Sequence, residues 1–116
     1  MITLKDYLMG RDTTHKSELT EQIKENANKL LNKVNLLLAE LGYKSCKVSS
    51  GWRPPSLNKT ITNAAKASAH QTGEAIDLLE KYDLYREDGD FTKGKYTNWC
   101  HLQTRPTKSG NRIFKP

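Results

Sequence analysis

The chain has 116 residues, the usual size of a single domain with one modest hydrophobic core, and we expect one domain over residues 1–116. Only 35% of the residues are hydrophobic, and no apolar run approaches the roughly 20 residues that span a bilayer, so the composition argues against a membrane protein. The net charge of +6 favours anionic partners, but the basic residues are scattered and lack interleaved aromatic residues, which argues against nucleic-acid binding.

The N-terminus and the cysteines indicate the compartment of synthesis. Residues Met1 to Asp6 lack the basic start and the apolar stretch of a secretory signal, so we expect synthesis in the cytosol. The two cysteines, Cys46 and Cys100, are too few for a disulfide framework and do not form a CxxC metal-binding pair. We expect both to be buried thiols.

The first predicted element is a short helix from Thr3 to Met9. Gly10 follows it, where glycine is favoured because it adopts positive φ without strain. Residues 13–15, which are Thr, Thr and His, are predicted to lie in a polar connector.

A long amphipathic helix is predicted from Ser17 to Leu41 and is stopped by Gly42. Ser17 is the expected N-cap, and Glu18 and Glu21 follow in the first turn, where acidic residues complement the helix dipole. The apolar residues recur at steps of three and four and are predicted to face the core: Leu19, Ile23, Ala27, Leu30, Val34, Leu37, Leu38 and Leu41.

Beyond Gly42 the pattern changes to short strands and turns. Ser45 to Ser49 alternates in polarity and predicts a strand, and Gly51 to Pro55 then interrupts regular structure. Ser56 is predicted to cap a short helix that runs to about Asn63.

Two further strands are predicted at Ala75 to Leu79 and at Trp99 to Gln103, separated by an acidic, turn-rich segment from Glu80 to Tyr96. Arg112 to Phe114 can form an edge strand, since Pro116 ends the chain. Together the elements predict an α+β fold in which a long N-terminal helix packs on a small, mainly antiparallel sheet.

Strand parity predicts where the polar residues of these two strands lie. Alternate residues share a face, so Asp77 and His101 each lie opposite to the apolar neighbours on their own strands. If the strands are adjacent, the apolar residues pack against the long helix, and Asp77 and His101 meet on the open face. His70 precedes Asp77 by seven residues, and Gly73 allows a tight turn that returns it to the same face. The apolar residues are Ile76, Leu78, Cys100 and Leu102.

Two imidazoles and one carboxylate, from His70, His101 and Asp77, form a zinc site with three protein ligands. Three protein ligands leave the fourth position for water, as in catalytic rather than structural zinc sites. Bound zinc lowers the pKa of that water and polarises a carbonyl, which amide hydrolysis near neutral pH requires. A single histidine is more often a surface residue, so the prediction depends on the set of three.

Three segments carry recognisable motifs. Ser68 to Asp77 reads SAHQTGEAID, Ser50 to Pro54 reads SGWRP, and Trp99 to Leu102 reads WCHL. They resemble, in the same order, the SxHxxGxAxD signature, the SGYR-type motif and the closing WxH segment of peptidase family M15. The resemblance covers roughly residues 49–103. It implies the fold that the D-Ala-D-Ala metallopeptidases share with the hedgehog signalling domain.

The resemblance also implies roles for individual residues. Arg53 would bind the substrate or stabilise the oxyanion, and its guanidinium fork suits a carboxylate or a developing negative charge on chemical grounds as well. Ser68 is either a substrate-contacting hydroxyl or a local cap, and Trp99, like Trp52, lines the cleft or belongs to the core. One zinc ion would be held by His70, Asp77 and His101.

The general base of the family is absent from its usual positions. The family has an acid three residues before the last ligand or a histidine two residues before it, but this chain has Asn98 and Trp99, which are not bases. Glu87, Asp88 or Asp90 of the acidic segment can supply the base. Alternatively, turnover proceeds without one, with the loss of roughly 10²–10⁴-fold in rate that general base catalysis supplies.

The resemblance implies a zinc peptidase that hydrolyses stem-peptide or cross-bridge bonds of peptidoglycan, as a D,D- or L,D-carboxypeptidase or endopeptidase. Its compact form resembles small phage-encoded members that act in lysis or are carried in the virion. We expect a monomer that acts at the bacterial cell wall and has no nucleic-acid or membrane partner. The competing hypothesis is a catalytically weak or inactive zinc-binding virion or structural domain that binds cell-wall peptides.

Overall fold

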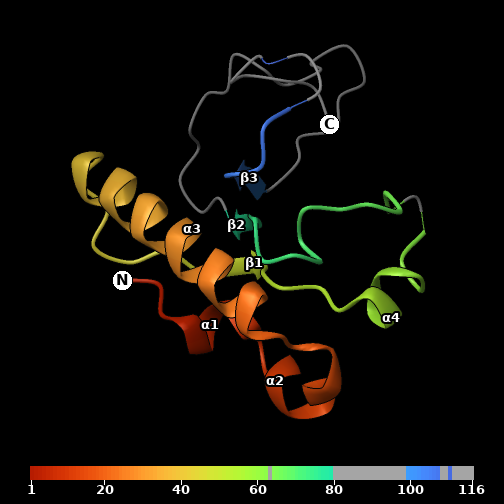
Figure 1. Cartoon of the computed structure of the whole chain (residues 1–116). Helices are drawn as coiled ribbons and strands as arrows, with labels where there is room; N and C mark the ends of the chain where they lie inside the picture. The colour runs from red at the N-terminus through yellow and green to blue at the C-terminus, as the bar shows by residue number, and fades with distance from the viewer. Residues whose placement is uncertain (63, 80–98, 108–109, 111–116) are drawn as a thin grey trace.

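The computed structural model describes residues 1–62, 64–79, 99–107 and 110. The long helix lies across one face of a three-stranded sheet, and the first short helix lies beside the long one (Figure 1). The predicted α+β fold is therefore confirmed. The elements are α1 (Leu4–Leu8), α2 (Arg11–Thr14), η1 (Lys16–Glu18), α3 (Glu21–Glu40), β1 (Val48–Ser50), α4 (Pro55–Asn58), β2 (Ala75–Leu79) and β3 (Trp99–Gln103).

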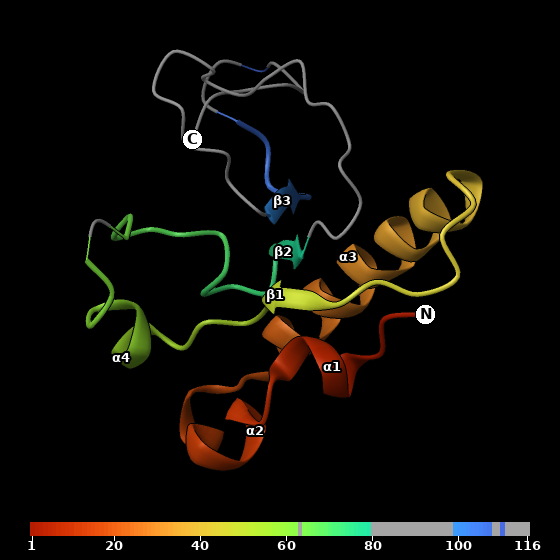
Figure 2. The same ribbon diagram turned by 180° about the vertical axis from the view of Figure 1, so that it is seen from behind.

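Helix α1 matches the short helix predicted at the N-terminus. Thr3 caps it, because its hydroxyl accepts the N–H of Asp6 at 3.2 Å while the Asp6 carboxylate accepts the N–H of Thr3 at 2.9 Å. Met9 and Gly10 then take positive φ values of 54° and 77° and reverse the chain. This reversal lays α1 beside α3 and β1 (Figure 2).

The polar connector predicted at residues 13–15 is wrong, because Arg11–Thr14 forms the helical turn α2. The carbonyl of Gly10 accepts the N–H groups of Thr13 and Thr14 and so starts the turn. The Arg11 guanidinium also donates to the carbonyl of Trp52, which ties α2 to the segment after β1. Polar composition predicted a connector here, and this distant acceptor favours a helical turn instead.

Helix α3 begins three residues later than predicted, with Thr20 and not Ser17 as its N-cap. The Thr20 hydroxyl accepts the N–H of Ile23 at 3.2 Å. Ser17 lies in η1, and the neighbouring Glu18 carboxylate accepts the N–H and the hydroxyl of Ser56 at 3.0 and 2.6 Å. This contact between distant segments explains why the earlier cap is not used.

The buried face of α3 is narrower than the periodicity predicted. Leu37 is 39% exposed and Leu41 is 62% exposed, so both were wrongly assigned to the core. Leu37 lies at the edge of the buried stripe, and Leu41 is the C-cap at the exposed end of the helix. Gly42 ends the helix with a φ of 82°, as predicted. The buried residues of α3 are Ala27, Leu30, Leu31, Val34 and Leu38.

The sheet is antiparallel with the strand order β1-β2-β3. Both β2 and β3 have the bounds that alternation predicted. Asp77 is directly opposite His101 in the β2–β3 pair, and on the other side it pairs with Ser50 of β1. Asp77 therefore lies at the centre of the sheet, between Ser50 on one neighbouring strand and His101 on the other.

Two neighbouring predictions were shifted or wrong. The strand predicted at Ser45 to Ser49 forms as β1 at Val48–Ser50. Helix α4 starts at Pro55 after Pro54 and is not capped by Ser56, because the Ser56 hydroxyl donates to Glu18. The helix ends at Asn58, before the predicted Asn63, which lies outside the described residues.

The apolar core lies between α1, α3 and the sheet. Tyr7 and Trp52 are fully buried in it, so Trp52 is a core residue and does not line a cleft. Ile76 and Leu78 belong to the same cluster, with Cys100 and Leu102 packed against it, as parity predicted.

Cys46 and Cys100 are free and only half-buried, so the expectation of two buried thiols was too strong. Burial nevertheless raises the pKa of the Cys46 thiol. Across the described residues, no helix combines the length and the apolarity needed to cross a membrane. The predicted acidic segment at 80–96 and the predicted edge strand at 112–114 lie outside the described residues.

The turn that leads into β2 packs directly on the start of α3. Gly73 has a φ of 78°, and a Cβ on it would lie 2.6 Å from the carbonyl oxygen of Ile23. The neighbouring Thr72 carbonyl accepts the side-chain N–H of Asn26 at 2.9 Å. Only glycine combines this backbone conformation with so close an approach.

We predict that Gly73→Ala destabilises the fold much more than Gly42→Ala. Both glycines have positive φ, which costs an alanine about 1–2 kcal/mol, but a Cβ on Gly42 meets nothing within 4 Å. The clash with α3 adds about 1–3 kcal/mol for Gly73→Ala. Urea unfolding followed by the helix signal in circular dichroism measures both variants, and equal losses of stability would show that the close approach is not tight.

Candidate metal centre

Three potential metal ligands meet on the open face of the sheet. His70 lies in the loop before β2, Asp77 in the middle of β2 and His101 in the middle of β3. Each offers one ligand atom, and the three atoms lie within 4.8 Å of one another. The structure thus brings together the three residues that the sequence singled out.

The His70 ring is buried and oriented by the backbone. Its Nδ1 donates to the carbonyl of Gly51 at 2.9 Å, because a carbonyl oxygen only accepts. This bond fixes the tautomer with the lone pair on Nε2, which lies 3.4 Å from Asp77 Oδ2. The Ser68 hydroxyl accepts the backbone N–H of His70 at 3.3 Å, so the structure gives Ser68 a local positioning contact.

His101 is oriented from the opposite side by Gln103. The side-chain amide of Gln103 donates to the carbonyl of Arg105 at 2.6 Å, so its oxygen faces His101 Nε2 at 2.9 Å. His101 Nε2 therefore carries a proton, and Nδ1 is directed at Asp77 Oδ1 at 2.7 Å. The two histidines thus present different nitrogens, Nε2 from His70 and Nδ1 from His101.

Asp77 is ionised between the two imidazoles. Burial alone would raise its pKa, but the hydrogen bond from His101 and the closeness of the His70 ring outweigh burial and hold the pKa well below its usual range. In turn, the hydrogen bond to Asp77 raises the pKa of His101. A proton on His101 Nδ1 therefore lies where a metal ion would bind, and metal binding would displace it.

The three side chains fit a tetrahedral zinc ion. Ligand atoms held at about 2.0–2.1 Å from zinc are separated by roughly 3.3 Å. The distance of 3.4 Å between His70 and Asp77 already matches this value, and the 2.7 Å between His101 and Asp77 needs only a small opening. Two imidazole nitrogens and one carboxylate oxygen are also a donor set that suits zinc.

Exposure increases across the site from one ligand to the next. The side chain of His70 is 5% exposed, that of Asp77 13% and that of His101 32%. A metal ion held by the three would therefore be enclosed on the His70 side and open beside His101. An open position is what a catalytic zinc site requires.

The site depends on a close approach at Gly51. A Cβ on Gly51 would overlap the carbonyl oxygen of Tyr7, the same oxygen that accepts the N–H of Trp52 at 3.1 Å. The carbonyl of Gly51 in turn holds His70. Glycine is thus required where β1 runs past α1 toward the site.

Arg53 lies next to the ligands. Its backbone N–H donates to the carbonyl of His70 at 3.0 Å, and its positive charge opposes the rise in the pKa of His101. Its guanidinium donates to neutral oxygens of Asn58 and Ser50 at 3.2 and 3.3 Å, and it forms no ion pair within the part of the chain that the structure describes.

The remaining predicted site residues are only partly described. The Trp99 backbone is paired with Leu79 at the start of β3. Glu87, Asp88 and the base position Asn98 lie outside the described residues. Sequence reasoning missed Gln103, although its position two residues after His101 on one strand face was sufficient to indicate it.

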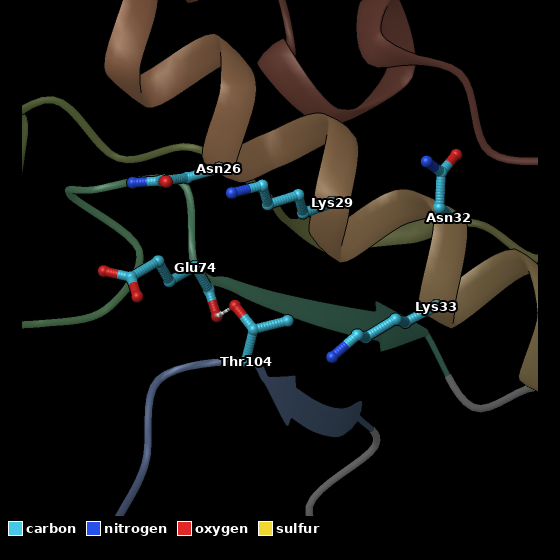
Figure 3. Close-up of a pocket in the computed structure, with 6 residues that line it drawn as sticks. All are labelled: Asn26, Lys29, Asn32, Lys33, Glu74 and Thr104. Carbon is cyan, nitrogen blue, oxygen red and sulfur yellow. Dashed lines mark hydrogen bonds between the residues drawn. The ribbon is translucent and has the colours of Figure 1, made fainter.

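A separate hollow lies between α3 and the sheet, away from the ligands (Figure 3). It has a volume of about 440 Å³, and α3 lines one side of it with Lys29 and Lys33 from successive turns. The Glu74 carboxylate at its rim is paired with Arg105 at 3.4 Å. None of the three candidate ligands lines this hollow.

The comparison with protein families agrees with this site. The sequence model of the Peptidase M15 family matches residues 6–103, which include the three candidate ligands and Arg53. The chain therefore belongs to the Peptidase M15 family, and membership supports a peptidase. No curated protein matches the chain, and no solved structure matches it.

We predict that Gln103→Ala weakens zinc binding by about 10- to 100-fold, because loss of a hydrogen-bond partner that orients a ligand typically has this effect. Gln22→Ala is the matched control, since the Gln22 amide donates to Asn26 on the exposed side of α3. Competition with a chelator of known affinity measures both variants. Equal affinities for Gln103→Ala and the unaltered protein would refute a role of Gln103 in orienting His101.

Proposed function

We propose that this protein is a zinc-dependent peptidase that hydrolyses stem-peptide or cross-bridge bonds of bacterial peptidoglycan. The proposal is supported above all by the three ligand atoms, which converge with their tautomers already set by Gly51 and Gln103. Membership of the Peptidase M15 family supports the class of reaction. Its place of action would be the bacterial cell wall, in phage lysis or from the virion, as in the small members that the chain resembles.

When bound, zinc would supply an activated water and polarise the scissile carbonyl. The residues of the chain supply the surroundings. Asp77 and the two histidines hold the metal with one open position, and Gly51 and Gln103 hold the rings. Arg53 offers a positive charge to a substrate carboxylate or to the developing oxyanion.

The general base is proposed to come from Glu87, Asp88 or Asp90. Asn98 and Trp99, where the family has an acid or a histidine, carry no basic group. An acid from the segment after β2 is the nearest replacement in the sequence, since that segment connects the two strands that carry Asp77 and His101. The alternative function, a zinc-stabilised domain that binds cell-wall peptides without cutting, is favoured by this same substitution at Asn98.

We predict that zinc stabilises the folded protein through His70 and not through His15. At a free zinc concentration 100 times the dissociation constant, binding to the folded state alone adds about 2.7 kcal/mol, which raises the melting temperature. His15→Ala is a matched control, because His15 contacts Thr14 in an exposed turn. Thermal unfolding with zinc and with chelator should show the shift in His15→Ala and no shift in His70→Ala; an equal shift in both would contradict the site.

We predict that the zinc-loaded protein releases new fragments from purified peptidoglycan. The fragments should be absent after chelation and in His70→Ala, and Arg53→Ala should slow their release by about 10²- to 10³-fold, as expected for loss of an oxyanion-stabilising donor. Mass spectrometry of digests from several wall chemotypes identifies the bond. If zinc stabilises the protein but no chemotype yields metal-dependent fragments, the non-catalytic alternative is correct.

A further inference from the structure

The described part of the chain buries two polar side chains almost completely, and both lie at the candidate site. They are His70, a candidate ligand that is 4% exposed, and Asn58, which is 5% exposed and reaches the site through its hydrogen bond with Arg53. A buried polar group is retained only where its hydrogen bonds are made inside the protein. His70 is a candidate ligand, whereas the function proposed above leaves Asn58 without a role.

Asn58 is held rigidly at the end of α4. Its side-chain N–H donates to the carbonyl of Ala65 at 2.9 Å, and its backbone N–H donates to the carbonyl of Pro54 at 2.9 Å. Because the carbonyl of Ala65 only accepts, the amide orientation is fixed and Oδ1 is left to face the Arg53 guanidinium. This oxygen accepts Nη1 of Arg53 at 3.2 Å.

Arg53 is fixed at its other end by Ser50. The Ser50 hydroxyl accepts Nη2 at 3.3 Å, and Ser50 is the strand partner of Asp77 in the β1–β2 pair. The guanidinium is thus held beside the strand position that carries the central candidate ligand. The Arg53 backbone is bonded to His70 as well.

Among the described residues, the side chains that bond Arg53 carry no negative charge. Asn58 and Ser50 are both neutral acceptors, no ion pair of Arg53 exists among the described residues, and its Nε is buried without a partner. A cation without a carboxylate partner is unfavourable in a partly buried position. An aspartate at position 58 would compensate the charge with nearly the same shape, yet the chain has the neutral amide.

We propose that Asn58 is a positioning residue that holds the Arg53 guanidinium beside the candidate metal centre and keeps its charge available for an anionic oxygen of the substrate. The inference rests on the proposed peptidase function and deepens it. The anionic oxygen belongs either to the terminal carboxylate of the peptide or to the oxyanion that forms during hydrolysis. These two sources act at different stages, so kinetics distinguishes them.

The first test is a double-mutant cycle between Asn58→Asp and Arg53→Ala in the zinc-loaded protein, with peptidoglycan fragments as substrate. Asn58→Asp should lower kcat/KM by about 10- to 100-fold, because the new carboxylate would compete with the substrate anion for Arg53, and a hydrogen bond to a charged group usually has this weight. It should leave zinc affinity unchanged. A raised KM would identify the carboxylate as the ligand of Arg53, and a lowered kcat would identify the oxyanion.

The same cycle separates positioning from general damage. Asn58→Asp also removes the side-chain N–H that donates to the Ala65 carbonyl. Any damage from losing that hydrogen bond would be the same with Arg53 present or absent. In the Arg53→Ala background, Asn58→Asp should therefore have little further effect; an equal loss in both backgrounds would overturn the proposal. Asn32→Asp, which adds a carboxylate at an exposed position of α3, is the matched control and should retain full activity. Ser50→Ala, which removes the other neutral acceptor, should lower kcat/KM several-fold even if Asn58→Asp fails to fold.

A second readout does not depend on turnover, so a failure of the peptidase function is distinguishable from a failure of this inference. In the zinc-loaded protein, the Arg53 Nε–H signal in nitrogen-15 NMR should shift on addition of N-acetyl-D-alanyl-D-alanine. Asn58→Asp should abolish the shift, and Asn32→Asp should preserve it. A shift that is unchanged in Asn58→Asp, or a signal that never responds to the probe in the unaltered protein, would refute the role of Asn58.

Discussion

The close approach of Gly51 to Tyr7 is the contact on which the rest of the site depends. It allows the Trp52 N–H to reach the Tyr7 carbonyl, which joins α1 to the end of β1. From the same point, the Gly51 carbonyl orients the His70 ring, and the His70 carbonyl receives the Arg53 N–H. A candidate ligand and a candidate substrate-binding cation are therefore positioned by one backbone crossing. The Tyr7 hydroxyl extends this arrangement to β2, because it donates to the Ala75 carbonyl at 2.9 Å.

The sheet divides the molecule into a packing side and a chemical side. On β2, Ile76 and Leu78 belong to the core, and Asp77 between them faces the two histidines. Because Asp77 and His101 are opposite each other in the antiparallel register, a slip of one residue in the β2–β3 pair would separate them. Core packing on one face thus enforces the register that the metal site needs on the other.

The parts of the fold that were predictable from sequence are those set by local alternation. The bounds of β2 and β3 follow from period-two patterning, and the grouping of Asp77 with His101 follows once the two strands are adjacent. The cap of α3 was not predictable in the same way, since Ser17 and Thr20 are both competent caps. The choice between them depends on the contact of Glu18 with Ser56, which lies 38 residues further along the chain.

The same distinction applies inside the site. The role of Gln103 could have been predicted from strand alternation, because Gln103 lies on the same strand face as His101. The role of Asn58 could not have been predicted from the sequence, since it depends on how the loop to Ala65 folds back and on the neutral acceptors that bond Arg53. The close approach at Gly51 was likewise not predictable, because the carbonyl that it meets belongs to Tyr7, 44 residues earlier, and a local sequence pattern does not indicate such a distant contact.

The three candidate ligands differ in exposure, so the site is more accessible on one side than on the other. Among the described residues, His70 is the most enclosed of the three ligands and His101 the most exposed, so the accessible side of the site lies toward β3. Arg53 lies on the other side of the central strand, beside β1. The strand order therefore places the candidate cation and the accessible ligand on opposite sides of Asp77.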